Sequence, residues 1–197
     1  MKLFISPTSP YARLCRAVII EKGLTDQVEL DKTDPWQSDP ALVEANTFSK
    51  IPSLVLDDGE VLTESLLISQ YLDGQAGGKS LVDDADRTKV FKKLGVAFGF
   101  IDAAVAIASA GKFKNDLSDD AIITRRHAAI ERSLPLLDQL PVGDPSTPDL
   151  GDLALAVALG YLDFRFKEFD WRANAPQISQ WYKEIASRPA LNETMPG

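Results

Sequence analysis

Short apolar runs and amphipathic stripes alternate over the first eighty residues of the chain. Residues 3–5 and 28–30 are apolar runs of strand length, and a helical stripe lies between them. Ser9 followed by Pro10 is typical of a helix start, and Gly23 is a natural residue just past a helix end. The pattern also predicts a short helix over 40–45, strands over 50–56 and 61–62 joined by a turn at 57–60, and a helix over 63–72. The order βαβ-α-ββα predicts an α/β unit around one small mixed sheet.

A glycine-containing polar stretch at 75–80 reads as a flexible linker, and the pattern after it is helical throughout. Asp149 and Asp152 resemble a capping box, in front of a segment that is apolar nearly all round and is expected to be a buried central helix. Helices are expected over 84–110, 118–137, 153–166 and 176–188. We therefore predict two domains, an α/β domain over 1–76 and an all-helical domain over 82–197.

Composition narrows the classes of function. The chain carries 21 Lys and Arg against 29 Asp and Glu, a net charge of −8, and no basic run is present to neutralise nucleic-acid phosphates. Neither a signal-peptide segment nor a stretch long enough to span a membrane is expected, so we predict a cytoplasmic protein without a membrane partner. With Cys15 as the single cysteine and His127 as the single histidine, no disulfide, thiolate cluster or zinc site is expected.

Four short motifs follow one another along the chain. They are residues 6–13 after the first strand, Lys50-Ile51-Pro52 before the third, Thr63-Glu64-Ser65 at the third helix, and the box at 149–152. In order and spacing they resemble the cytosolic glutathione transferase family, in particular a bacterial serine-type member, and residues 187–191 resemble the ending of many bacterial members. The resemblance implies a thioredoxin-like N-terminal domain that binds glutathione and an all-helical C-terminal domain that completes the substrate site.

The chain departs from the family pattern in one loop. Asn46-Thr47-Phe48-Ser49 replaces the more usual Asn-Pro-x-Gly ahead of Lys50-Ile51-Pro52. This change is expected to alter the loop beside the glycyl end of glutathione, while the position of Pro52 is kept.

Ser9 is the candidate catalytic residue. A free thiol with a pKa near 8.5 is only about 3% ionised at pH 7, and lowering that pKa by about two units takes roughly 2.7 kcal/mol. A hydrogen bond to a charged group supplies about 1.5–3 kcal/mol, and a helix N-terminus adds a fraction of a kcal/mol to ~2 kcal/mol. The resemblance implies that the Ser9 hydroxyl donates to the glutathione sulfur; capping its own helix is the plainer role, and the two are compatible. Ser6 is a competing hydroxyl, and Cys15, on the apolar stripe, is expected to be a neutral core thiol.

The remaining candidate residues bind glutathione by resemblance. Pro52 is implied to follow a cis bond, with the backbone of Ile51 pairing with the cysteinyl unit. Lys50 is placed near the glycyl carboxylate, although a solvated surface lysine is an equal alternative. Ser65 is implied to bind the γ-glutamyl carboxylate at a helix N-terminus and Glu64 the neighbouring ammonium, whereas local capping is the alternative for both.

Other residues are assigned more loosely. Trp36 is expected either at the rim of the glutathione site or in packing, and His127 in a structural or surface position. Arg13 and Arg16 could reach an anionic substrate, but they are expected to be solvated or paired at an interface. The resemblance places a second substrate between Ser9 and the long helix, and candidates for an apolar wall there are Phe98, Phe100 and Ile107.

These observations favour a glutathione transferase that joins the glutathione thiolate to small electrophilic, hydrophobic substrates, with peroxidase activity as a variant. Glutathione is then a co-substrate, and no metal is expected. A glutathione-dependent disulfide reductase is an alternative, although its usual cysteine is absent at position 9. A non-catalytic binding or assembly module on the same fold is another. The resemblance also implies a homodimer; Gly95 and Gly99 would permit close helix approach without establishing an interface.

Overall fold

The computed structural model describes residues 1–114, 116–117 and 119–196. By its internal contacts the chain divides into two compact units, Met1–Asp83 together with the segment from Arg188 on, and Asp84–Ser187. The C-terminal segment thus groups with the α/β unit, whereas the domain boundaries at 76 and 82 stay a prediction. Ser118, where we expected a helix to begin, lies outside the described residues.

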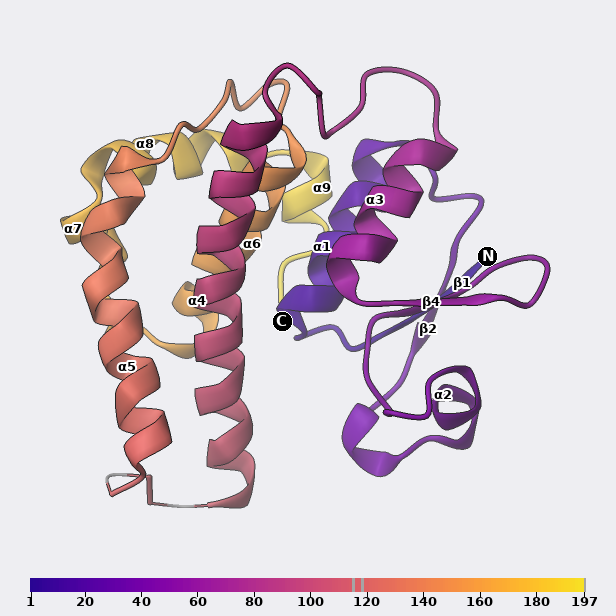
Figure 1. Cartoon of the computed structure of the whole chain (residues 1–197), viewed down its shortest axis with the longest axis horizontal. Helices are drawn as coiled ribbons and strands as arrows, with labels where there is room; N and C mark the ends of the chain where they lie inside the picture. Colours follow the sequence, from indigo (N-terminus) through magenta and orange to yellow (C-terminus); the bar gives the residue numbers. More distant parts are fainter. Residues whose placement is uncertain (115, 118, 197) are drawn as a thin grey trace. The chain divides into compact units, whose positions relative to one another are not determined.

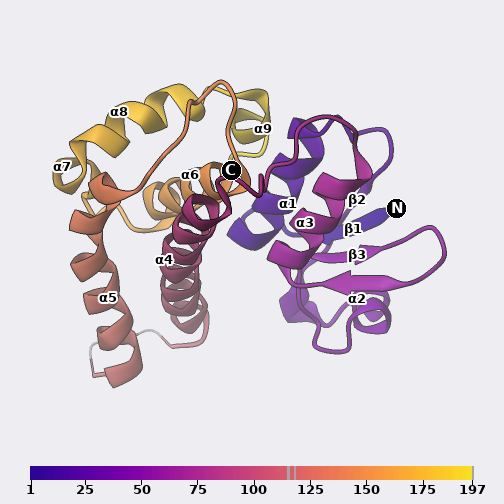
Figure 2. The ribbon, with the colours of Figure 1, turned by 45° about the horizontal axis from the view of Figure 1, so that its top comes forward.

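The α/β unit is built on a four-stranded mixed sheet of order β2-β1-β3-β4 (Figures 1 and 2). β1 pairs in parallel with β2 and antiparallel with β3, which pairs antiparallel with β4. The strands are β1 (Lys2–Ile5), β2 (Glu29–Lys32), β3 (Ser53–Val55) and β4 (Val61–Thr63). The predicted mixed sheet and thioredoxin-like order are confirmed, but β3 is shorter than the expected strand at 50–56, so that Lys50, Ile51 and Pro52 form the loop before it.

Helices cover both faces of this sheet. α1 and α3 pack together on one face, and α2 lies on the other (Figures 1 and 2). Leu14 and Val18 of α1 and Ile68 and Leu72 of α3 are fully buried, which fixes the apolar face of each helix. The elements of this unit are α1 (Pro10–Glu21), the 3-10 helix η1 (Pro35–Gln37), α2 (Pro40–Ala45), α3 (Ser65–Gln75) and α9 (Pro189–Asn192).

Arginine contacts tie the C-terminal segment to α1. Arg188 forms an ion pair with Glu21 at the end of α1. Arg13 Nη2 donates to the Leu191 carbonyl at 3.0 Å, and the Arg13 side chain is only 3% exposed. The expectation that Arg13 is a solvated or interface residue is therefore wrong, because its partners lie at the other end of the chain.

The second unit is all-helical. Its central helix α6 is buried from Leu150 to Leu162, which confirms the prediction of a buried central helix, and α4 packs against both α6 and α5. Its elements are α4 (Arg87–Phe113), α5 (Ala121–Ser133), the 3-10 helix η2 (Leu134–Gln139), α6 (Leu150–Arg165), α7 (Trp171–Asn174) and α8 (Pro176–Ile185). The single helix expected over 118–137 is interrupted because Pro135 lacks the N–H that an α-helix needs at that point.

A buried ion cluster joins α4 to the start of α6. The Lys93 side chain is 1% exposed, and its Nζ lies 2.6 Å from Asp149 Oδ2 and 2.6 Å from Asp152 Oδ1. The same two acids form the predicted capping box, with each side chain accepting from the other's backbone N–H. Gly143 N also donates to Asp152 Oδ1, at 3.2 Å. One cation is therefore shared by the two acids that cap the central helix.

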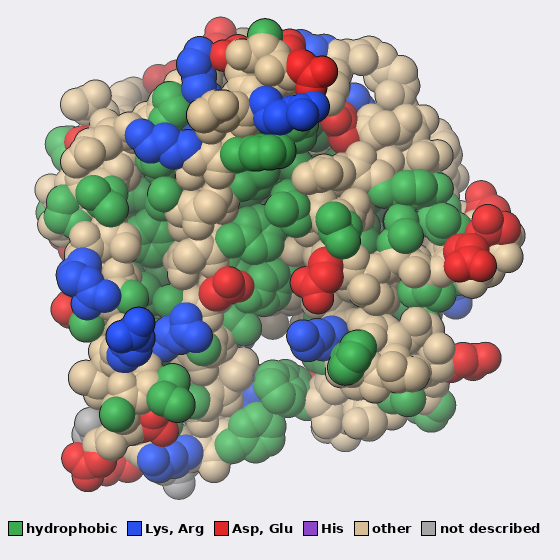
Figure 3. Space-filling model, in the orientation of Figure 1, with side chains coloured by type: hydrophobic (Ala, Val, Ile, Leu, Met, Phe, Trp, Pro, Cys, Tyr) green, Lys and Arg blue, Asp and Glu red, His purple; other side chains and the backbone are tan. Residues whose placement is uncertain are grey.

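The expectation that no stretch is long enough to span a membrane is wrong as to length and composition. Within the described residues, α4 (Arg87–Phe113) is 27 residues long and apolar enough to cross a membrane by those two measures. This is weak evidence, because the core helix of a soluble protein passes the same test. α4 also carries the buried Lys93 of the ion cluster. On the face shown in Figure 3, acidic and basic side chains are interspersed.

Candidate functional site

Sheet register gathers the three N-terminal motifs at one end of the sheet. Phe4, one residue before the end of β1, lies opposite Ser53, the first residue of β3. Ser53 in turn lies opposite Thr63, the last residue of β4. The loop after β1, the loop before β3 and the start of α3 after β4 therefore leave the sheet at the same end. These segments contain Ser9, the Lys50–Pro52 loop and the Glu64-Ser65 pair, which the sequence predicts for glutathione binding and catalysis.

Ser9 is the N-cap of α1. Its Oγ accepts a hydrogen bond from Ala12 N at 3.3 Å, and its side chain is partly exposed. That bond uses a lone pair of the oxygen, so the hydroxyl proton stays available for an acceptor. The first turn of α1, which the structure describes completely, carries no acidic side chain that would weaken the positive helix end. Ser6, the competing hydroxyl, belongs to the same loop, and its carbonyl accepts from Ser9 N at 3.1 Å.

The loop before β3 is held by buried polar side chains. The Ile51–Pro52 bond is cis, as the family resemblance implies. The carbonyl of Lys50 accepts from Asn46 Nδ2 at 3.2 Å and from Ser53 Oγ at 2.8 Å, while the Lys50 side chain is exposed. Asn46 Nδ2 also donates to Ser53 Oγ at 3.0 Å. Asn46 and Ser53 thus fix the backbone of the candidate binding loop.

The departure from the family pattern has a visible consequence in this loop. Ser49 stands where the family more usually has glycine, and it adopts a φ of 51°. This left-handed conformation is one that glycine adopts without a steric penalty and other residues adopt rarely. A serine therefore occupies a backbone conformation that suits glycine. The sequence analysis singles out this loop but misses the roles of Asn46 and Ser53, polar residues that lie four positions before Lys50 and directly after Pro52.

The start of α3 combines a strained residue with a buried one. Glu64 has φ 67° and ψ 115°, a conformation that costs a non-glycine residue on the order of 1–3 kcal/mol. Among the described residues the Glu64 side chain makes no capping hydrogen bond, and it is exposed. Ser65, the first residue of α3, is 4% exposed. The Glu64 side chain therefore does not satisfy the first-turn N–H groups of α3.

Cys15 is a buried, protonated thiol. Its side chain is fully buried, and that burial raises the pKa of Cys15 to about 12. Its Sγ lies 3.4 Å from the Ser65 carbonyl oxygen and 3.6 Å from Ser69 Oγ. The prediction of a neutral core thiol is confirmed.

The other candidates belong to other elements of the chain. Trp36 is 48% exposed in η1. Phe100 and Ile107 are buried in the helical unit, and Phe98 of the same helix is half-buried. Arg16 is partly buried, and its Nη2 donates to the Glu193 carbonyl at 3.5 Å.

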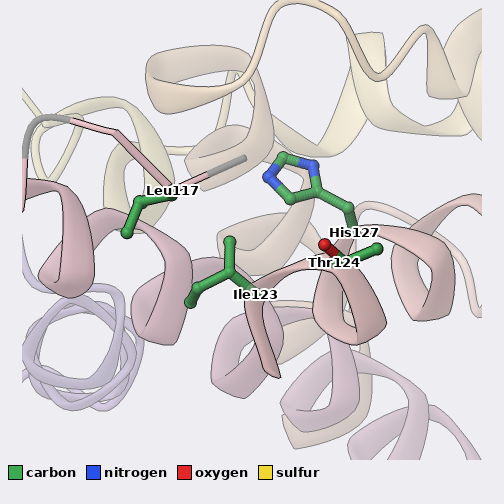
Figure 4. A pocket seen from close by; sticks show the side chains of 4 residues that line it. All are labelled: Leu117, Ile123, Thr124 and His127. Atoms are coloured by element: carbon green, nitrogen blue, oxygen red, sulfur yellow. The ribbon is translucent and has the colours of Figure 1, made fainter. Parts of the chain in front are cut away.

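His127 belongs to a separate cavity in the helical unit. The cavity has a volume of about 320 Å³ and is lined by Leu117, Ile123, Thr124 and His127 (Figure 4). The His127 ring also contacts Phe166 and Phe169, with centroid separations of 6.4 and 5.4 Å. None of the candidate glutathione-binding residues lines this cavity. The expected structural role of His127 agrees with these ring contacts.

Comparisons with known proteins agree over both units. Residues 3–80 match the glutathione S-transferase N-terminal domain, and residues 120–184 match the glutathione S-transferase C-terminal domain. The uncharacterized GST-like protein YibF of Escherichia coli is 29% identical, covering 100% of this chain and 98% of the relative.

Solved structures extend the similarity to the whole fold. A glutathione transferase family member from Pseudomonas fluorescens Pf-5 with bound glutathione is 33% identical at a TM-score of 0.91, covering 100% of this chain and 98% of that one. A glutathione S-transferase from Methylobacillus flagellatus with glutathione bound is 32% identical at a TM-score of 0.83, covering 100% and 99%. With both family domains matched in order and full-length relatives above 30% identity, the chain belongs to the glutathione S-transferase family.

Proposed function

We propose that this protein binds glutathione at the end of the sheet where the three motifs meet, and transfers its thiolate to small electrophilic, hydrophobic substrates. The observation that carries the proposal is the register Phe4–Ser53–Thr63, which brings Ser9, the Lys50–Pro52 loop and the start of α3 to one end of the sheet. The solved relatives that contain glutathione support the choice of ligand.

Each part of glutathione has a chemical counterpart in these segments. The γ-glutamyl carboxylate binds the open N–H groups and hydroxyl at Ser65, where the helix end favours an anion. The exposed carboxylate of Glu64 pairs with the neighbouring ammonium. The backbone of Ile51 pairs with the cysteinyl unit as a short added strand, and the exposed Lys50 side chain meets the glycyl carboxylate.

Ser9 then acts on the sulfur. Its hydroxyl donates to the thiolate while Oγ continues to accept from Ala12 N, so capping and catalysis coexist. This bond contributes about 1.5–3 kcal/mol of the roughly 2.7 kcal/mol that a two-unit fall in thiol pKa requires. The positive end of α1 contributes in the same direction. The thiol proton passes to solvent, and the thiolate attacks an electrophilic carbon, forming a C–S bond as the leaving group departs with the bonding electron pair.

Activity assays on Ser9 variants test this mechanism. Conjugation of a chloronitrobenzene, reduction of a hydroperoxide and reduction of a mixed disulfide are measured for wild type, Ser9→Ala, Ser9→Gly and Ser6→Ala. Ser9→Gly is the matched variant, because glycine keeps most of the cap stability and has no hydroxyl. We expect both Ser9 variants to lose about ten- to a hundredfold in kcat/KM for conjugation and Ser6→Ala to keep it. Full turnover in Ser9→Ala overturns the mechanism, and loss only in Ser6→Ala assigns the sulfur to Ser6.

The same assays decide the alternatives. With Cys15→Ala added, a mixed-disulfide reduction that is lost in this variant would favour a reductase, against which the full burial of Cys15 argues. A protein that neither binds immobilised glutathione nor gains thermal stability from it would be a non-catalytic module. Peroxidase activity uses the same thiolate and is measured by the hydroperoxide assay.

We also propose domain boundaries at 1–76 and 82–197 from the linker composition, a cytoplasmic location from the sequence, and a homodimer from the family resemblance. Size-exclusion chromatography with light scattering tests the dimer, and limited proteolysis between residues 76 and 82 tests the boundary. A monomeric mass by light scattering would contradict the homodimer, and first cleavage outside residues 76–82 would contradict the boundary.

A further inference from the structure

Cys15 connects the two helices that carry the proposed ends of the glutathione site. It lies on α1 six residues after Ser9, which places it about 9 Å further along one rigid helix. Its Sγ lies 3.4 Å from the carbonyl oxygen of Ser65, the first residue of α3. The same sulfur lies 3.6 Å from Ser69 Oγ, one turn further along α3. A single side chain of α1 therefore contacts the first two turns of α3.

The donors and acceptors in this contact follow from the chemistry of the groups. A carbonyl oxygen only accepts and a thiol has one proton, so the Cys15 S–H donates to the Ser65 carbonyl. When both contacts are used, the Ser69 hydroxyl donates to Sγ. Burial raises the pKa of Cys15 to about 12, so the proton that makes this bond stays in place across the physiological range. These two hydrogen bonds, from the Ser69 hydroxyl to Cys15 and from Cys15 to the Ser65 carbonyl, are shielded from water. Cys15 and Ser69 are fully buried, and Ser65 is 4% exposed.

We propose that Cys15 is a positioning residue for glutathione binding, holding the first turn of α3 at a fixed distance from α1. The inference rests on the proposed function, in which α1 presents Ser9 to the sulfur and α3 presents Ser65 to the γ-glutamyl carboxylate. Without the thiol, the Ser65 carbonyl and the Ser69 hydroxyl lose a shared partner, and the turn that follows the strained Glu64 is less restrained. Cys15 touches neither the sulfur nor the substrate in this account.

The effect should appear in glutathione affinity and not in the chemical step. Losing this hydrogen-bonded contact in Cys15→Val is expected to raise the Kd and KM for glutathione about two- to tenfold. Because Ser9 is untouched, kcat at saturating glutathione should stay within about twofold of wild type. Cys15→Ser keeps a donor and an acceptor at the same place and is expected to restore most of the affinity.

Val18→Ala provides the matched control, since Val18 is fully buried on the same helix, three residues further on. It removes core volume but no hydrogen-bonding group, so it should lower the melting temperature and leave the glutathione Kd unchanged. Calorimetric titration with glutathione and steady-state kinetics on all four proteins give the comparison. If Cys15→Val does not fold, Ser69→Ala removes the other end of the same contact and should raise the Kd in the same direction.

Failure of the inference differs from failure of the proposed function. If wild type binds glutathione and Cys15→Val binds it equally well, or Val18→Ala weakens it as much, Cys15 is ordinary core packing and the inference is overturned. A fall in kcat alone also overturns it. If wild type does not bind glutathione at all, the proposed function fails.

Discussion

Replacing Lys93 by methionine removes the cation that separates two acids at the start of the central helix. Lys93 Nζ lies 2.6 Å from both Asp149 and Asp152, and the side chains of Lys93 and Asp152 are each 1% exposed. Methionine keeps an unbranched apolar stem of similar length, so the packing of that stem is largely retained. The change therefore isolates the loss of the charge.

The expected cost is large because Asp152 is left buried without its cation. Breaking a buried ion pair by removing one partner costs about 3–5 kcal/mol, a large part of the 5–15 kcal/mol that stabilises a typical protein. At roughly 2–4 °C per kcal/mol for a chain of this size, the melting temperature should fall by about 6–20 °C. Tryptophan fluorescence in urea measures the loss, since Trp171 and Trp181 both lie in the helical unit.

The pH dependence of this loss supplies a second test. Burial raises the pKa of the Asp152 carboxyl while Lys93 lowers it, so removing Lys93 should raise that pKa further. A carboxyl whose pKa is higher in the folded than in the unfolded state binds an extra proton on folding. The stability of the variant should therefore recover as the pH falls from 7 toward the unfolded value near 4.

Lys89→Met is the matched control, one helical turn earlier, where the lysine pairs with Asp86 at the surface. It should leave the urea midpoint unchanged. In a double-mutant cycle, Asp152→Asn should rescue part of the Lys93→Met loss by removing the orphaned charge. A Lys93→Met midpoint equal to that of Lys89→Met, or strictly additive effects in the cycle, would refute the reasoning.

Three further predictions concern other parts of the chain. A Cβ at Gly151 would lie 2.7 Å from the Val90 carbonyl oxygen, so Gly151→Ala should destabilise the protein by about 1–3 kcal/mol in urea titrations. Burial raises the pKa of Cys15 from 9.0 to about 12, so above pH 9 the folded state keeps a proton that the unfolded state loses. The free energy of unfolding should therefore fall by about 2 kcal/mol between pH 9 and 10.5, and Cys15→Ser should not show this fall. Asn46→Ala removes the bonds to the Lys50 carbonyl and Ser53 Oγ, and should raise the glutathione Kd about three- to tenfold by calorimetry.

Each of these has its own contrary result. Gly95→Ala is the control for Gly151→Ala, because a Cβ at Gly95 meets nothing within 4 Å and alanine favours a helix. Equal changes in stability in the two variants would contradict the close approach of α4 and α6. An alkaline stability profile shared by wild type and Cys15→Ser would mean that the thiol is not titrating as described. If Asn46→Ala binds glutathione as tightly as wild type, the claim that Asn46 fixes the binding loop is wrong.

Features set by local pattern could be predicted from the sequence. The strand at 3–5, the cap at Ser9 and the box at Asp149 and Asp152 depend on neighbouring residues, and the structure confirms them. The mixed sheet followed from the order of these elements. The glutathione-site residues could be predicted only by the resemblance of their motifs to the family. The register of β1, β3 and β4 gives the physical reason why those motifs lie at one end of the sheet.

Features set by distant partners could not be predicted in this way. Lys93 reads as one more lysine on an amphipathic helix, because its partners lie 56 and 59 residues away. Arg13 is buried by a segment 178 residues further on. The positive φ of Glu64 has no sequence signal of its own, since glutamate rarely adopts it. Pro135 is a local signal in the sequence, and it ends the α-helix there because it has no backbone N–H.

The pKa of the glutathione thiol when bound tests the central claim most directly. The ultraviolet absorbance of the thiolate is followed against pH for glutathione bound to wild type, Ser9→Ala and Ser6→Ala. Wild type and Ser6→Ala should titrate about two units below the free thiol value near 8.5, and Ser9→Ala should return upward by about one to two units. A bound thiol that titrates identically in wild type and Ser9→Ala would contradict the account.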